Sequence, residues 1–274
     1  MEEMQNQEAP KMSSIEQEEF EMSHSDKLVG VFSEPNSTFG KMSKFPPKTT
    51  DWVIPILIVI VVAILSQFLM MNNPTIKAAV FEKQITAVEK QFNDAVAKGE
   101  MTQAQADQQL ETIRDTMEQG GVGRMIGVFV GIPIVTFIFF FIVSGVFLIL
   151  AKFVLKGEGT YKEAMVAYGL PHYIIAIQMI IMVIAALAMN KLFTGTSVAD
   201  FIGTEKNTIA GFLLGKLDLF SIWFYVVFGI GLAKMFKSSN TQKYIIGVVA
   251  VWLVFGLLFF AIAKAVPWLS FLAG

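Results

Sequence analysis

A stretch of twenty-seven residues without a charge runs from Met125 to Ala151. An α-helix rises ~1.5 Å per residue, so about twenty apolar residues are enough to cross the ~30 Å hydrocarbon core of a bilayer. The stretch therefore predicts a membrane-spanning helix with residues to spare. Within it, Gly127 and Gly131 are four positions apart and predict a face for close helix packing, while Pro133 predicts a kink.

Four further stretches share this composition. They are Trp52–Met71, about Ala164–Met189, Leu219–Ala233 and Tyr244–Ala263. In the second of these four, the membrane helix proper begins either at the start of the stretch or at Pro171. No stretch has an ionisable side chain in its middle third, where ion-coupled carriers and proton pumps usually keep one. The sequence thus predicts an all-α, polytopic membrane protein with five transmembrane helices.

Two segments between the spans lie outside the membrane in this prediction. Residues 74–119 carry apolar residues three or four positions apart, which is the spacing of one helix face. These residues are Phe81, Ile85, Val88, Phe92, Val96, Leu110, Ile113 and Met117. They predict an extramembrane helical hairpin, whose role is either that of a stable cap or that of a surface for a partner. Residues 190–217 predict a mixed loop with an amphipathic piece at 208–217.

The region before the first span divides by composition. Residues 1–26 hold eight acidic residues against a single lysine, so they predict a disordered acidic tail. Residues 27–51 mix apolar and basic residues, and Pro35 and Gly40 exclude one long helix. We expect them to form an interfacial juxtamembrane segment at the lipid headgroups, with a plain linker as the alternative. Residues 52–274 then form the five-span domain, with the 74–119 hairpin inserted in it.

Lysines and arginines near the spans indicate the orientation, because short cytoplasmic loops are enriched in them. If the N-terminus is inside, the inner loops at 152–162 and 234–243 are short and basic. The basic residues of the hairpin are instead interspersed with eight acidic ones. We therefore expect a cytoplasmic N-terminus and a C-terminus on the opposite side of the membrane.

The amino-acid composition limits the kinds of partner and of chemical site that we expect. Hydrophobic residues make up 54% of the 274, the mean hydropathy is +0.58, and the net charge of −2 implies no nucleic acid partner. The absence of cysteine excludes disulfides, thiol nucleophiles and cysteine zinc sites. His24, in the expected tail, and His172 do not form a metal-binding pair, and no phosphate loop or nucleophile motif is present. We expect no catalytic residue, cofactor or metal, and hence no enzyme.

Five residues are candidates for a functional or structural site. Asp218 precedes the fourth span, where a carboxylate is suited to cap the helix N-terminus and to face the helix dipole; ligand binding is the alternative. Gln178 lies inside the third span and predicts an interhelical hydrogen bond, with a place in a translocation path as the alternative. Tyr168, Pro171 and His172 stand in the first turns of that third span, near a membrane surface.

Short segments in a fixed order resemble the Yip family of multi-pass membrane proteins. They are Ser33-Glu34-Pro35-Asn36-Ser37-Thr38-Phe39 before the first span, Tyr161-Lys162-Glu163-Ala164 and Tyr168-Gly169-Leu170-Pro171 at the third, and Asp218-Leu219-Phe220-Ser221-Ile222-Trp223 and Gly229-Ile230-Gly231-Leu232 at the fourth. Together they cover about residues 27–266. The resemblance implies five spans, a cytoplasmic N-terminal region and no catalytic residues.

Eukaryotic members of the Yip family bind prenylated Rab GTPases and act in vesicle traffic. This chain lacks their Asp-Leu-Tyr-Gly-Pro motif and contains the 74–119 hairpin, and in both respects it is similar to the bacterial branch. Rab binding is therefore not carried over. The resemblance implies a protein of the bacterial cytoplasmic (inner) membrane.

The function that the resemblance implies is non-enzymatic, namely membrane organisation or the scaffolding of a partner. The alternative is a transporter or channel component for a small or lipidic solute. The expected partners are the lipid bilayer and a protein that the sequence does not identify. A homo-oligomer is a further expectation that the sequence leaves open.

Overall fold

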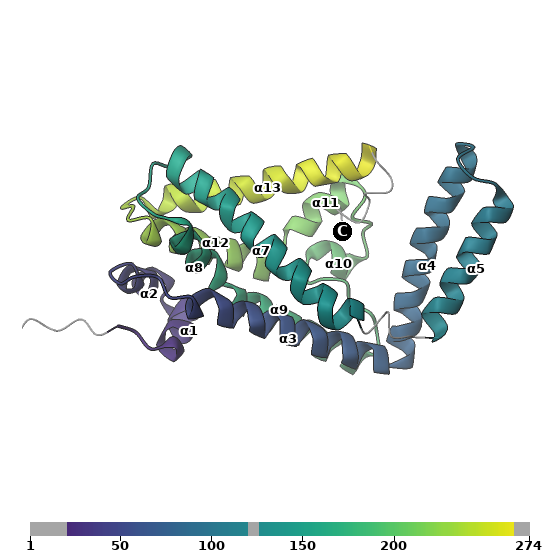
Figure 1. Cartoon of the computed structure of the whole chain (residues 1–274), viewed down its shortest axis with the longest axis horizontal. Coiled ribbons are helices and arrows are strands. Elements are labelled where there is room, and N and C mark those ends of the chain that lie inside the picture. Colours follow the sequence, from purple (N-terminus) through teal and green to yellow (C-terminus); the bar gives the residue numbers. More distant parts are fainter. Residues whose placement is uncertain (1–20, 120–125, 266–274) are drawn as a thin grey trace, which may run out of the picture.

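The computed structural model describes residues 21–119 and 126–265, so residues 1–20 of the expected acidic tail lie outside it. Four helical segments in the described part are long and apolar enough to cross a membrane. They are α3 (Thr50–Asn72); α7 (Ile132–Ile149) with the π-helical turns η1 (Gly127–Gly131) and η2 (Leu150–Val154); α8 (Tyr161–Gly169) with α9 (His172–Met189); and α13 (Thr241–Ala265). Figure 1 shows them lengthwise in one bundle, and the predicted all-α polytopic class is confirmed.

The fourth crossing differs from our expectation of one short helix preceded by a loop outside the membrane. The chain instead forms α11 (Ile209–Lys216) and α12 (Leu219–Met235), which meet at an angle of 59°. Alone, α12 is about 25 Å long at ~1.5 Å per residue, which is shorter than the ~30 Å hydrocarbon core. A fifth crossing therefore needs both helices of the bent pair.

Ring contacts along α13 show that α11 continues in the direction of α12. The rings of Tyr225 in α12 and Trp252 in α13 stack with centroids 4.5 Å apart, and further along α13 the Phe212 ring of α11 lies 5.0 Å from Phe260. The Lys216 ammonium lies 5.1 Å from the Trp252 ring, midway along α13. If the bent pair is one crossing, it carries Lys216 and Asp218 at its break, just before the stretch Leu219–Ala233 that the sequence predicts as the span. The sequence did not indicate that Lys216 belongs to a crossing, because α11 is too short to be recognised as part of a span.

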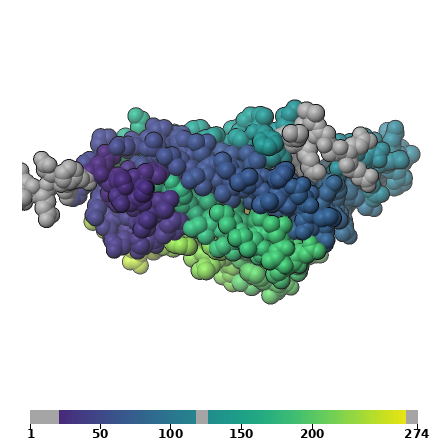
Figure 2. Space-filling view, turned by 90° about the horizontal axis from the view of Figure 1, so that it is seen from below, coloured from purple at the N-terminus to yellow at the C-terminus, as the bar shows by residue number. Residues whose placement is uncertain are grey.

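The segment before the first span is folded onto the bundle. The helices α1 (His24–Ser33) and α2 (Pro35–Met42) place Val31, Phe39 and Met42 in the main hydrophobic core. Figure 2 shows this segment, in purple, packed against one end of the bundle. Val31, Phe39 and Met42 are buried in protein, whereas Phe32 and Phe45 are half-buried, so the segment is a folded part of the bundle and its place at the lipid headgroups stays a prediction. The first of these helices also begins within the last residues of the expected disordered tail.

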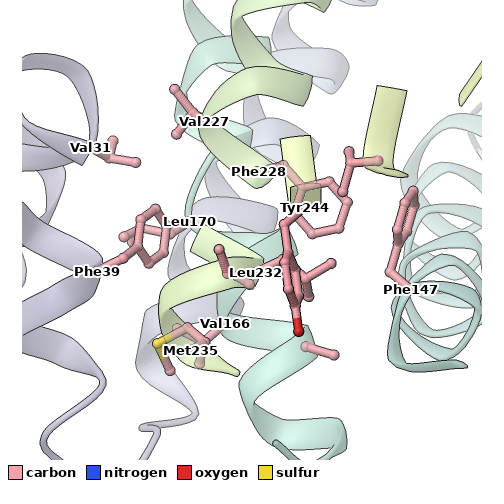
Figure 3. Close-up of a cluster of buried hydrophobic side chains, with 14 of the residues drawn as sticks. Val31, Phe39, Phe147, Val166, Leu170, Val227, Phe228, Leu232, Met235 and Tyr244 are labelled. Atoms are coloured by element: carbon pink, nitrogen blue, oxygen red, sulfur yellow. The ribbon is translucent and has the colours of Figure 1, made fainter. Parts of the chain in front are cut away.

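Phe39 joins the N-terminal segment to the membrane helices. Its ring is fully buried against α12, where Gly231 leaves the necessary room, because a Cβ at Gly231 would lie 2.8 Å from the ring. Figure 3 shows Phe39 and Val31 on one side of this core and Phe147 and Tyr244 on the other. The core therefore extends from α1 and α2 to α7, α12 and α13.

The predicted hairpin is formed by α4 (Pro74–Ala97) and α5 (Gln103–Gln119), with its apolar seam half-buried between the two helices. In Figure 1 it stands at the opposite end of the bundle from α1 and α2, with α5 on the far side of α4. Its base is attached to the bundle, since Ile76 is fully buried and Asn73 Nδ2 donates a hydrogen bond to Asn190 Oδ1 at the end of α9 (2.8 Å). We refer to the two ends of the bundle as the N-terminal end and the hairpin end.

Close helix packing occurs at different glycines from those expected. A Cβ at Gly127 or Gly131 would meet no described atom within 4 Å, so the predicted packing face is wrong within this chain. At Gly229 in α12, a Cβ would lie 2.6 Å from the Cα of Ile245 in α13. The backbones of α12 and α13 therefore touch at this point, which only glycine permits.

Candidate functional site

Asp218 stands at the break between α11 and α12. Its backbone is extended (φ −126°, ψ 118°), so α12 starts as a new helix, and Oδ1 accepts a hydrogen bond from the Phe220 amide at 2.9 Å. This is the N-cap geometry that the sequence led us to expect, with the carboxylate at the positive end of the α12 dipole. The cap satisfies a backbone amide at the start of α12 that has no partner within the helix.

The second oxygen of the Asp218 carboxylate ties the break to the neighbouring segments. Oδ2 accepts hydrogen bonds from Gln178 Nε2 (3.0 Å), Thr196 Oγ1 (3.0 Å) and Ser221 Oγ (3.1 Å). Gln178 Nε2 also donates to Thr196 Oγ1 at 2.6 Å, so the expected interhelical hydrogen bond of Gln178 has two partners. Asp218 is only 7% exposed, and four donors compensate the cost of burying its charge. Asp218 therefore caps α12 through Oδ1 and, through Oδ2, joins α12 to α9 and to the segment before α10. We refer to the hydrogen bonds that Oδ2 accepts as the clamp.

Sequence reasoning identified Asp218 and Gln178 but missed their two hydroxyl partners. Ser221 carried a weak signal, since it is the third residue after the cap, where capping side chains often meet. Thr196 carried none, because it comes from the segment between α9 and α10 (Val198–Ile202) and reaches the site only through tertiary folding.

A second polar cluster lies around the start of α10, and in the sequence it begins next to Thr196. Ser197 and Asp200 form a capping box, and Asp200 also accepts a hydrogen bond from Thr194 Oγ1 (2.9 Å) and pairs with Lys206 (3.0 Å). Burial alone would raise the pKa of Asp200, but the hydrogen bonds from Ser197, Lys206 and Thr194 lower it overall. Asp200 therefore stays ionised and neutralises Lys206.

Lys216 lies on the other side of the same break and faces α13. Its ammonium stands over the rings of Phe212 (5.2 Å) and Trp252 (5.1 Å), and a Cβ at Gly256 would lie 2.6 Å from Nζ. The absent side chain at Gly256 thus lets the ammonium rest against the α13 backbone. Among the residues that the structure describes, no carboxylate forms an ion pair with Lys216.

Lys216 also lines a cavity of about 370 Å³ between α7, α11 and α13. The only other charged side chain of its lining is that of Lys206, and the rest is mainly apolar or aromatic, including Phe139, Tyr225 and Phe259. Cavities that bind small molecules typically measure roughly 300–1,000 Å³ and combine apolar walls with a few polar groups. In size and lining this cavity falls within that class.

Tyr168, Pro171 and His172 form a separate group at the junction of α8 and α9. Pro171 is the N-cap of α9, and the helix is already formed from Tyr161 onward, so the span begins before Pro171. His172 Nδ1 donates a hydrogen bond to the Tyr168 carbonyl at 2.8 Å, and both rings pack against Phe224. This aromatic packing is structural, and no described hydrogen bond links the group to Asp218 or Gln178.

A buried ion pair at the N-terminal end was not foreseen. Lys27 Nζ in α1 lies 2.9 Å and 3.0 Å from the two carboxylate oxygens of Asp51 at the start of α3, with both side chains about 5% exposed. His24, which we had assigned to the tail, is hydrogen-bonded through Nε2 to the Tyr173 hydroxyl at 2.6 Å. The only sequence signal was an acidic residue directly before the Trp52 anchor. This cluster fastens α1 to α3 and α9.

Glu21 extends that cluster towards solvent. It lies 2.8 Å from Lys48 and 3.8 Å from Lys27, and the hydrogen bond from Lys48 lowers the pKa of Glu21. The described residues contain no group of three histidine, cysteine or acidic side chains that could hold a metal ion. The described polar clusters are thus hydrogen-bonded clamps, together with one cavity that is lined by two lysines.

Comparison with known proteins agrees with the fold. The model of the Yip1 domain family matches residues 29–263, which run from within α1 to near the end of α13 and include the hairpin and the bent pair α11–α12. Neither a curated protein nor a solved structure gives a significant match to the chain. The matched region includes Phe39, Asp218, Gly229 and Gly231, whose structural roles are described above. The chain belongs to the Yip1 domain family of multi-pass membrane proteins.

Proposed function

We propose that this Yip1 family protein is a non-enzymatic membrane scaffold that holds a protein partner on its α4–α5 hairpin. The observation that carries the proposal is the position of α5 on the far side of α4 from the bundle (Figure 1). Two helices whose outer faces do not pack on the bundle contribute little to its stability. Their exposed residues, such as Gln108 and Thr112, are free to contact another protein.

The orientation and location belong to the same proposal. We assign the N-terminal end to the cytoplasm and the hairpin to the opposite side of a bacterial inner membrane, as the loop charges and the family resemblance lead us to expect. The partner is then a protein with a domain on that side. Self-association through the hairpin is the alternative within this proposal.

Site-specific photo-crosslinking in native membranes tests the scaffold function. A photoreactive residue at Gln108 or Thr112 should give one defined adduct with another protein. The matched control is Asn207, an exposed residue of the segment before α11, where the adduct should be missing. Absence of any adduct at both hairpin positions, or the same products from Asn207, would refute a partner-holding hairpin. An adduct with a second copy of the chain would instead support self-association.

A second candidate is a transporter component for a small or lipidic solute. The observation that favours it is the broken helix, because many carriers build their solute sites where a membrane helix is interrupted. The four hydrogen bonds to Asp218 speak against this candidate, since they leave the carboxylate little capacity to bind an ion. Solute flux in liposomes that depends on Asp218 would favour the transporter over the scaffold.

A further inference from the structure

The cavity around Lys216 continues into a second hollow. A groove of about 800 Å³ runs along α11 and α13, is lined mainly by apolar side chains, and shares Phe212 and Lys216 with the cavity. The Lys216 ammonium therefore stands at the junction of two mainly apolar hollows, with Lys206 in the lining of the cavity and Lys264 in that of the groove. This arrangement fits an elongated molecule with an apolar body and a polar head.

The Lys216 ammonium at the junction has no described carboxylate partner and could therefore take an anion. Lys206 is neutralised by Asp200 at 3.0 Å, whereas Lys216 has only the aromatic faces of Phe212 and Trp252 as described partners. A ring face attracts a cation less strongly than a counter-ion does. Lys216 belongs to α11, but its ammonium lies level with the middle of α13, at Trp252. An uncompensated charge in the middle of a membrane helix bundle is costly and is usually retained for a function.

We propose that the cavity binds an anionic phospholipid, with its phosphate at Lys216 and an acyl chain along the groove between α11 and α13. A membrane surrounds this face with lipid, and basic pockets between membrane helices are suited to bind lipid head groups. Lysine is a common phosphate ligand as a point charge. The inference goes beyond the scaffold function and does not depend on it.

Lipid titration of the purified full-length protein in detergent tests the proposal. Dioleoyl phosphatidylglycerol should bind with saturation in native mass spectrometry and should raise the melting temperature. Dioleoyl phosphatidylcholine has the same chains and phosphate, but its choline cation offsets the phosphate charge and would face the lysines of the cavity, so it should bind more weakly by about tenfold. Inorganic phosphate alone should give no stabilisation, because it lacks the apolar body.

Substitutions at the junction locate the binding. Lys216→Met should weaken phosphatidylglycerol binding by about tenfold and remove the preference over phosphatidylcholine. The matched control is Lys191→Met, since Lys191 is also stacked over a ring, that of Phe193, but is exposed and outside the cavity. This control should bind both lipids as the unmodified protein does.

A second variant keeps the test decisive if Lys216→Met does not fold. Ile142→Trp would fill the cavity from α7 and leave Lys216 in place, because Ile142 lines the cavity and is 58% exposed. It should also weaken phosphatidylglycerol binding. Unchanged lipid binding in the folded variants, equal binding of the two lipids by the unmodified protein, or full stabilisation by phosphate alone would each overturn the proposal.

Discussion

At the residue scale, Asp218 does more than the helix capping that its position suggested. If Asp218 were a helix cap alone, Asp218→Asn would be mild, because asparagine also caps helices well. In the structure Oδ1 caps α12 while Oδ2 accepts from Gln178, Thr196 and Ser221. An amide nitrogen in the place of Oδ2 cannot accept a hydrogen bond, so asparagine keeps the cap and loses the clamp.

We therefore predict that Asp218→Asn lowers the free energy of unfolding by ~1–3 kcal/mol, the cost of leaving buried donors without an acceptor. Asp218→Leu should cost more, since it also removes the cap, which is worth ~1 kcal/mol. Ser221→Ala, which deletes one donor only, is the control and should have the smallest effect. The measurement is denaturant unfolding in detergent. Equal stability of Asp218→Asn and the unmodified protein would mean that the clamp contributes nothing.

The buried pair of Lys27 and Asp51 should show strong coupling. Asp51→Leu or Lys27→Met leaves one buried charge without its main partner, and breaking such a pair typically costs ~3–5 kcal/mol. The double variant Lys27→Met, Asp51→Leu removes both charges and should recover most of this loss. A double-mutant cycle of unfolding free energies checks the prediction. If the two single effects simply add, the pair is not coupled and α1 is held by its apolar contacts alone.

At the scale of helices, the contact of α12 with α13 depends on Gly229. A methyl group there would meet the Cα of Ile245 at 2.6 Å, and a backbone cannot move aside as a flexible side chain can. We predict that Gly229→Ala destabilises the protein by ~1–3 kcal/mol, the usual cost of overpacking. Gly145→Ala in α7 is the control, since a Cβ there has open space, and it should be neutral or slightly stabilising. A thermal melt that does not separate the two variants would contradict this packing.

The sequence revealed those helices whose hydrophobic pattern is local and long. Uncharged runs located α3, α7, α9, α12 and α13, and the spacing of apolar residues located α4 and α5. The pattern could not reveal that α11 completes a crossing, because its eight residues match an amphipathic loop helix equally well. It also could not reveal the docking of α1, since the same apolar and basic residues suit either a headgroup interface or a protein surface. For the site, Asp218 and Gln178 were found as isolated polar residues, whereas Thr196 and Lys216 became meaningful only when folding brought distant segments together.

The hairpin should be separable from the bundle. Its seam joins α4 to α5, and its attachment is confined to the base, where Ile76 is fully buried. We predict that replacing residues 77–117 by a short Gly/Ser linker, which retains Ile76, leaves an inserted protein with the melting temperature of the intact one. Removal of Ile76 as well should lower that temperature. A variant that aggregates although Ile76 is kept would show that the hairpin is needed for folding.

At the scale of the whole molecule, the broken crossing determines how the chain is placed across the membrane. With α11 and α12 counted as one crossing, the chain crosses five times, so its two ends lie on opposite sides. The turns at 155–160 and 236–240 then share the N-terminal end with α1, and they are joined there by a hydrogen bond from the Glu158 amide to the Phe236 carbonyl (3.0 Å). If α11 were a re-entrant element instead, the loop charges and the hairpin would have to be assigned differently.

Cysteine labelling decides between these arrangements, and the chain suits it because it has no cysteine of its own. Gln108 in the hairpin and Asn240 before α13 are exposed, so each can be replaced singly by cysteine; at Asn240 the change also removes the hydrogen bond from the Lys243 amide to Oδ1 (3.0 Å), a helix cap worth ~1 kcal/mol. In intact cells a membrane-impermeant maleimide should label the variant at Gln108 and spare the one at Asn240, because short basic loops such as 234–243 remain in the cytoplasm. Opening the membrane should make both equally reactive, which controls for local accessibility. Labelling of both positions from outside would rule out an odd number of crossings between them, and labelling of Asn240 alone would reverse the orientation.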